Sequence, residues 1–165
     1  GIITTETIKA IQEVARPDTI IALDPKPRPS ISYTGLSVMT PNRSEAIKLA
    51  GITEEDYKEF PAEIVCKRIY EKYAPKNLIV TLGADGMLLS EKGEVISKVP
   101  TYAREVFDVS GAGDTVIASL CVALATGASM LDAIHFANTA AGFVVGKIGT
   151  ATATPDDIIA YASHK

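Results

Sequence analysis

Short apolar runs alternate along the chain with longer segments that are apolar at every third or fourth position. The runs at 19–23, 36–40 and 77–82 have the length and composition of buried strands. Two further runs, 87–90 and 95–99, flank a Lys-Gly pair and predict a β-hairpin. The pattern therefore predicts a sheet whose first three strands are separated by longer connections.

Helical periodicity fills most of the segments between these runs. Helices are predicted over 5–15, 41–51, 61–73, 116–125 and 129–145 and from 155 onward, with a short one beginning at 53–56. Strands that alternate with helices imply an α/β layer fold with a mostly parallel sheet.

Composition narrows the class of protein. The chain has 165 residues, 47% of them hydrophobic, and a formal net charge of −4, which suits a single domain over 1–165. Mild acidity argues against a nucleic-acid partner, and no apolar run reaches the length of a membrane span. Cys66 and Cys121 have no metal-ligand spacing, as expected of free thiols in the cytoplasm.

A polar, glycine-containing turn at 107–115 leads directly into the most apolar helix. Ser110 or Gly111 is expected to cap that helix, and the glycines allow a ligand to approach the backbone closely. First-turn amides at a helix N-terminus form an anion site suited to phosphate. Asp114 stands in the same turn, where it is either a base for phosphoryl transfer or simply a complement to the helix dipole.

The amino-acid sequence of this turn excludes two common nucleotide-binding motifs. It lacks the Gly-x-x-x-x-Gly-Lys of a Walker A loop, and Val116 replaces the third glycine of a Rossmann fingerprint. Asp-x-Ser-Gly-Ala-Gly-Asp-Thr instead resembles the C-terminal signature of the ribokinase/PfkB family of carbohydrate kinases. The resemblance implies that Asp114 is the catalytic base and that Gly111, Ala112 and Gly113 form the anion hole.

Asn42 and Glu45 match a second motif of the same family, Asn-x-x-Glu. The resemblance implies that the pair organises Mg²⁺ and phosphate, with Glu45 holding the metal through water. Asn at an N-cap with Glu three residues later is also a capping box, which helix chemistry alone explains. Both interpretations remain open, since a cap occupies the end of a helix that faces a site.

A third motif, Thr81-x-Gly83-x-x-Gly86, follows the strand at 77–82. By resemblance it is the nucleotide loop that meets ATP phosphates or ribose, although a glycine turn between strands needs no ligand. The resemblance also implies that Asn138 and Gly142 wall the adenine pocket.

Two loops carry further expectations. By resemblance, Asp108 and the loop 147–150 surround a monovalent cation such as K⁺ behind the anion hole. Asp24, Lys26 and Arg28 stand in a Pro-rich loop at the end of a predicted strand, where ligands of α/β sheets gather. Asp-Pro-Lys-Pro-Arg resembles bacterial heptose-phosphate kinases of the family, while a solvated Pro-rich turn is the alternative.

Together these features imply the C-terminal, ATP-binding portion of a three-layer ribokinase-like fold. The chain begins at Gly1 without Met, so we expect the sugar-binding and lid part to lie upstream. The expected reaction is ATP-dependent phosphorylation of a sugar or sugar phosphate, with ATP and Mg²⁺ as cofactors and heptose phosphate preferred. The alternative is a non-catalytic adenine-nucleotide-binding regulatory module. Alone, the chain is expected to be inactive and to form a homo-oligomer or associate with the missing half.

Overall fold

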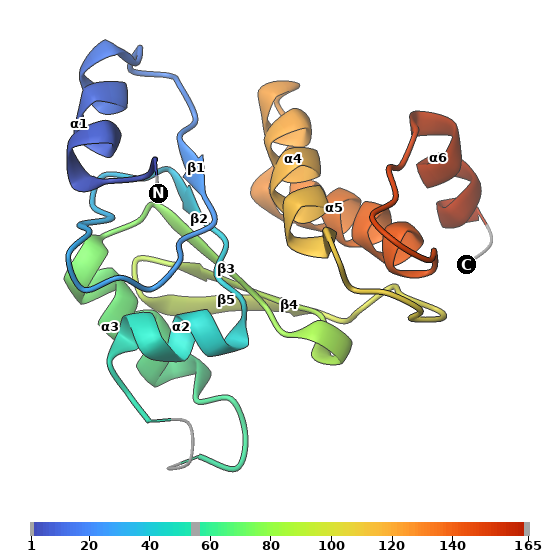
Figure 1. Ribbon diagram of the computed structural model, residues 1–165, viewed down its shortest axis with the longest axis horizontal. Coiled ribbons are helices and arrows are strands. Elements are labelled where there is room, and N and C mark those ends of the chain that lie inside the picture. Colours follow the sequence, from blue (N-terminus) through green and yellow to red (C-terminus); the bar gives the residue numbers. More distant parts are fainter. Residues whose placement is uncertain (1, 54–56, 164–165) are drawn as a thin grey trace. The chain divides into compact units, whose positions relative to one another are not determined.

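A computed structural model describes residues 2–53 and 57–163, which form six α-helices and one five-stranded sheet (Figure 1). The order is α1 (Thr5–Val14), β1 (Ala22–Leu23), β2 (Val38–Met39), α2 (Arg43–Ala50), α3 (Ala62–Tyr73), β3 (Asn77–Thr81), the 3₁₀ turn η2 (Gly83–Asp85), β4 (Met87–Glu91), β5 (Glu94–Val99), α4 (Ala112–Ala125), α5 (Met130–Val145) and α6 (Pro155–Ser163). The short helix predicted to begin at 53–56 falls largely on residues outside the described part.

The sheet has the strand order β1-β2-β3-β4-β5. Strands β1, β2 and β3 are parallel, with Ala22 opposite Val38 and Met39 opposite Leu78. The predicted hairpin is present: Lys92 (φ 49°) and Gly93 (φ 85°) connect β4 to β5 with the positive φ values of a type I′ turn. The α/β fold is therefore confirmed, with a mixed sheet.

The chain divides into two compact units. The first unit comprises Gly1–Val80 and Leu88–Ser97, and the second comprises Thr81–Met87 and Lys98–Lys165.

In the first unit, α2 and α3 pack against each other on one side of the sheet, and α1 lies on the other side (Figure 1). Strand β3 is buried at its three central positions, as expected of a strand covered on both faces. The largest side chains of this core are fully buried: Tyr33, Leu36, Val38, Met39, Leu49, Val65, Ile69, Ile79, Val80 and Leu88.

Strands β1 and β2 are shorter than the runs at 19–23 and 36–40 predicted. The Ile21 amide donates to the side-chain oxygen of Ser37 at 3.1 Å instead of to a strand carbonyl. A hydroxyl therefore takes the place of a ladder acceptor where the two segments first meet, and regular pairing begins one residue later.

In the second unit, α4 packs on α5, and α5 packs on α6. Small residues on α5, among them Ala133, Ala137 and Ala140, are fully buried and allow this close approach. The prediction that α4 is a buried helix is correct on one face only. Val116 and Leu120 are buried, whereas Val122 is 61% exposed because the packing on α5 covers a single face of α4.

No helix in the described part of the chain is long and apolar enough to cross a membrane.

Candidate active site

The N-terminus of α2 carries the first group of candidate residues, and two of its backbone amides, those of Asn42 and Glu45, donate to side chains. The Asn42 Oδ1 accepts a hydrogen bond from the Glu45 amide at 3.0 Å, and the Glu45 Oε2 accepts one from the Asn42 amide at 2.9 Å. This reciprocal pair is the predicted capping box. It uses one carboxylate oxygen of Glu45 and leaves Oε1 for another partner.

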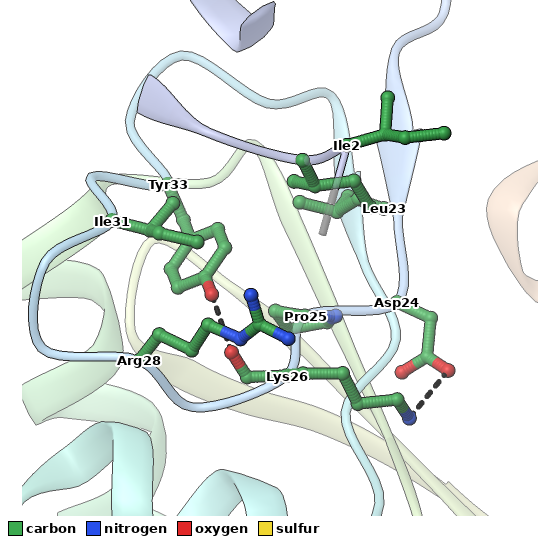
Figure 2. A pocket seen from close by; sticks show the side chains of 9 residues that line it. Ile2, Leu23, Asp24, Pro25, Lys26, Arg28, Ile31 and Tyr33 are labelled. Atoms are coloured by element: carbon green, nitrogen blue, oxygen red, sulfur yellow. Dashed lines mark hydrogen bonds and ion pairs between the residues drawn. The ribbon is translucent and has the colours of Figure 1, made fainter. Parts of the chain in front are cut away.

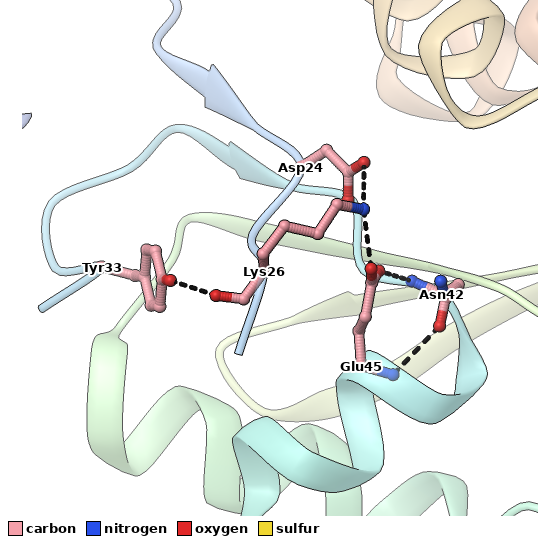
Figure 3. Close-up of polar contacts among 5 residues, drawn as sticks. All are labelled: Asp24, Lys26, Tyr33, Asn42 and Glu45. Atoms are coloured by element: carbon pink, nitrogen blue, oxygen red, sulfur yellow. Dashed lines mark hydrogen bonds and ion pairs between the residues drawn. The ribbon is translucent and has the colours of Figure 1, made fainter. Parts of the chain in front are cut away.

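That partner is Lys26, which lies in the loop after β1 (Figure 3). Its Nζ is 2.7 Å from the Glu45 Oε1 and 3.0 Å from the Asp24 Oδ2. The hydrogen bond to Glu45 raises the pKa of Lys26; burial opposes this rise, and Asp24 reinforces it. The structure thus joins two of the predicted groups, the Pro-rich loop and the Asn-x-x-Glu motif. Sequence reasoning missed this link because 19 positions separate Lys26 from Glu45.

The Pro-rich loop also lines a cavity of about 130 Å³ (Figure 2). Leu23 and Ile31 contribute apolar walls, while Lys26 and Arg28 contribute cationic side chains. Sites that enclose a drug-sized ligand are typically about 300–1,000 Å³. This cavity alone is therefore too small to enclose a nucleotide.

The glycine turn at the start of α4 is organised differently from α2. Gly111 is the N-cap, with φ 79° and ψ 0°, and no side chain caps the helix. The Ala112 amide donates to the Val109 carbonyl at 3.2 Å. Within the described part of the chain, the amides of Gly113 and Asp114 have no hydrogen-bond acceptor. The Asp114 side chain is exposed in this same first turn.

The side chain of Asp108 connects the glycine turn to the 147–150 loop. Its carboxylate accepts hydrogen bonds from the Ser110 amide at 2.8 Å and the Gly149 amide at 3.2 Å. The pKa of Asp108 is lowered, most of all by the Ser110 hydroxyl and then by the Ser110 and Gly149 amides. A Cβ on Gly111 would lie 3.1 Å from Thr150 Cγ2, so the 147–150 loop packs closely on the turn. The structure brings Asp108 and this loop together, and the cation predicted between them stays a prediction.

The predicted nucleotide loop is a tight turn closed by its own backbone. The Leu82 amide donates to the Gly86 carbonyl at 2.8 Å, and the Gly86 amide donates to the Gly83 carbonyl at 3.0 Å. A Cβ on Gly86 would come within 2.0 Å of the Val99 carbonyl oxygen, so packing requires glycine there. Gly83 has φ 62° and open space around it, and Thr81 is half-buried at the end of β3. Of the two glycines, Gly83 is the one accessible to a ligand.

On α5, Asn138 is only 4% exposed, and its Nδ2 donates to the Pro100 carbonyl at 2.7 Å. A Cβ on Gly142 would lie 3.1 Å from the Ala103 amide nitrogen, so this glycine allows the same segment to lie against the helix. These residues hold 100–103 along α5, and the adenine role assigned to them stays a prediction. Sequence reasoning missed the hydrogen bond between the Tyr102 hydroxyl and His135 Nδ1, 2.7 Å long, which joins the same two segments.

Comparison with known proteins decides the family. The model of the pfkB family of carbohydrate kinases matches residues 3–157. The chain belongs to this family. The resemblance inferred from the glycine turn is therefore confirmed.

Curated relatives include the bifunctional protein HldE of Pelobacter propionicus, 40% identical over 160 residues, and that of Geobacter sulfurreducens, 40% identical over 163 residues. Each match covers 96% of this chain and 32% of the relative, so the pfkB chain spans about a third of their length.

Solved structures confirm the ribokinase-like fold. Ribokinase from Thermotoga maritima has a TM-score of 0.81 at 28% identity, and the match covers 98% of this chain and 54% of that one. Arabidopsis thaliana ribokinase, solved with ribose and ATP, has a TM-score of 0.77 at 26% identity, with 95% and 51% covered.

Proposed function

We propose that the chain is the ATP-binding part of a kinase that transfers a phosphoryl group from ATP to a hydroxyl of a sugar or sugar phosphate. One observation carries the proposal within this family: the uncapped N-terminus of α4 has unpaired amides and an exposed carboxylate in the same turn. Phosphoryl transfer needs both donors for the charge on the moving group and a base for the acceptor proton.

Each residue of the turn has a role in this reaction. Asp114 accepts the proton of the attacking hydroxyl, and the amides of Gly113 and Asp114 donate hydrogen bonds to the phosphoryl oxygens. The Ala112 amide joins them only when its long bond to the Val109 carbonyl, 3.2 Å in this structure, gives way to the anion. Gly111 supplies the left-handed backbone that aims these amides outward, and Gly83 and Asn138 hold the nucleotide.

The chemistry of the first unit fits Mg²⁺. Two carboxylates, from Asp24 and Glu45, already meet one cationic group, the ammonium of Lys26. Mg²⁺ is commonly held by one or two carboxylates together with water and substrate phosphates. No group of three or more acidic, His or Cys side chains forms a complete metal cage among the described residues. Glu45 would therefore hold the ion through water beside Asn42, and the bound ion would neutralise phosphate charge.

A monovalent cation such as K⁺ is proposed near Asp108 and the 147–150 loop. Asp108 already accepts two amides, and its lowered pKa keeps the carboxylate charged. A cation there would offset this negative charge behind the anion site.

The acceptor is proposed to be a sugar or sugar phosphate, with heptose phosphate preferred from the wording of the 24–28 loop. Because the chain covers about a third of the HldE relatives, we propose that sugar contacts come from other parts of the protein or from an associated copy. The alternative, a regulatory module that binds adenine nucleotide without catalysis, fits the same open helix end and predicts nucleotide binding without turnover.

The test is Asp114→Asn in the full-length protein, assayed for ADP release with a panel of sugars and sugar phosphates. Asn keeps the shape and removes the base, so turnover should fall by about 10²–10⁴-fold while nucleotide affinity measured by calorimetry stays nearly intact. A variant that keeps most of its kcat would show that Asp114 only complements the dipole of α4. Wild-type protein that binds nucleotide but releases no ADP with any acceptor would favour the regulatory alternative.

A further inference from the structure

Lys26 is held more firmly than its place in an exposed loop suggests. Pro25 and Pro27 flank it, and each fixes its own φ angle. The Tyr33 hydroxyl donates a hydrogen bond to the Lys26 carbonyl (Figure 3), and Tyr33 itself is only 1% exposed. The Tyr73 ring packs edge-on against Tyr33, with ring centroids 5.5 Å apart. The backbone of Lys26 is thus anchored to the core of the first unit.

The side chain of Lys26 ends between two carboxylates that are much less exposed than it is. The side chains of Asp24 and Glu45 are 23% and 13% exposed, whereas that of Lys26 is 61% exposed. Glu45 accepts from Lys26 through Oε1 and from the Asn42 amide through Oε2. Both oxygens of the carboxylate are therefore fixed, one by the helix and one by the loop.

We infer that Lys26 is a positioning residue for Glu45, an inference that rests on the proposed role of Glu45 in binding Mg²⁺ with nucleotide. The capping box fixes one edge of the Glu45 carboxylate, and the ammonium group fixes the other. Without Lys26, the Glu45 carboxylate rotates about its single remaining hydrogen bond and is repelled by Asp24. The cost falls mainly on metal-dependent nucleotide binding, because the Lys26 side chain is 61% exposed and an ion pair with a solvated partner contributes little to stability.

The experiment compares Lys26→Met, Glu45→Gln and the double variant in the full-length protein. Affinity for ADP is measured by calorimetry at saturating Mg²⁺ and again with EDTA, and thermal unfolding is recorded for each protein. Groups that orient a metal ligand typically contribute about 10–100-fold. We expect each single variant to weaken Mg²⁺-dependent ADP binding by about tenfold. The double variant should be no weaker than Glu45→Gln alone, because Lys26 acts through Glu45.

Two further variants separate positioning from charge. Lys26→Met combined with Asp24→Asn has the same net charge as the wild type but still lacks the group that holds Glu45, so binding should stay weak. Lys26→Arg keeps a cationic donor and should restore part of the affinity. Lys48→Met, which removes an exposed cation from the other end of α2, is the matched control and should bind as the wild type does.

The outcomes distinguish this inference from the proposed function. Wild-type affinity in Lys26→Met, full recovery in the charge-matched variant, or additive losses in the double variant would each overturn the positioning role while the kinase proposal stands. Equal weakening with and without Mg²⁺ would also overturn it, because a residue that acts through Glu45 affects only the metal-dependent part. A wild-type protein that binds no nucleotide would overturn both.

Discussion

The N-termini of α2 and α4 are completed in opposite ways. At α2, Asn42 and Glu45 exchange two hydrogen bonds that satisfy each other's amides. At α4, the cap is Gly111, and the next amides have no acceptor within the described part of the chain. An anion can reach the Gly113 and Asp114 amides of α4 directly, whereas at α2 it would have to displace a side chain to reach the amide of Asn42 or Glu45. The same structural feature, a helix start, is thus capped by side chains at α2, beside the proposed Mg²⁺ site, and left open at α4 as a candidate anion site.

Other helices show that an uncapped start is not sufficient for a site. Side chains of Thr4 and Ser129 accept first-turn amides at α1 and α5, as Asn42 does at α2. Helix α3 also lacks a side-chain cap, but it begins after Pro61 rather than after glycine. What sets α4 apart is the combination of a left-handed glycine, a second glycine and an exposed acid in one turn.

Among substitutions at the helix ends, the largest effect on stability is expected from Gly111→Ala. A left-handed residue other than glycine costs about 1–2 kcal/mol, and the added methyl would also lie 3.1 Å from Thr150 Cγ2. The turn should shift, with a loss of about 1–2 kcal/mol in the free energy of unfolding and at least about a tenfold fall in nucleotide affinity. Urea denaturation and calorimetry on the full-length protein measure the two quantities.

Gly51→Ala is the matched control for Gly111→Ala. Gly51 ends α2 with φ 65°, and no atom would lie within 4 Å of its Cβ. It should lose similar stability while nucleotide affinity is unchanged. Equal affinity losses in both variants would mean that the effect of Gly111→Ala is general destabilisation.

The next largest loss of stability is expected at the capped N-terminus of α2. Asn42→Ala removes the acceptor for the Glu45 amide and should destabilise the protein by about 1 kcal/mol, within a range of 0.5–2. Asn42→Asp keeps an acceptor at the cap and should retain most of the stability. If urea midpoints of the two variants coincide, the capping box does not hold α2 in place.

Much of this comparison was predictable from sequence, because caps and glycine turns are local. Asn42 and Glu45 are three positions apart, and the 107–115 turn carries its chemistry in nine consecutive residues. The contacts that connect distant segments were not predictable. The bonds from Lys26 to Glu45 and from Asn138 to Pro100 depend on how strands and helices pack, and no local pattern encodes them. The lengths of β1 and β2 were over-predicted for the same reason, because the Ser37 side chain replaces one backbone acceptor where the two strands begin to pair.

Gly113→Ala tests the uncapped N-terminus of α4 with a substitution that should raise the stability of the protein where Gly111→Ala lowers it. Gly113 is in the first turn of α4, where alanine is a better helix former by about 0.5–1 kcal/mol. The variant should unfold at higher urea concentration and yet bind nucleotide more weakly, because the methyl group obstructs approach to the amides. A stabilised protein with unchanged affinity would indicate that the anion does not approach the Gly113 amide.

The smallest effect is expected at the N-terminus of α6, where Thr154 and Asp157 form hydrogen bonds with each other. The Asp157 Oδ2 accepts from the Thr154 hydroxyl at 2.6 Å and from the Thr154 amide at 3.0 Å, and these bonds, the hydroxyl's first, lower the pKa of Asp157. A carboxyl whose pKa is lower in the folded state stabilises the protein above its unfolded pKa, about 3.9, and this contribution is lost as the pH falls through the folded value. The melting temperature of Asp157→Asn should therefore be slightly below that of the wild type at pH 7, and the difference should shrink as the pH falls below about 4 and through the folded pKa. Asp156→Asn removes the same charge from the same turn and leaves the Thr154 bonds in place. If its difference from the wild type follows the same pH course, the charge of the first turn accounts for the effect and the hydrogen bonds between Thr154 and Asp157 do not.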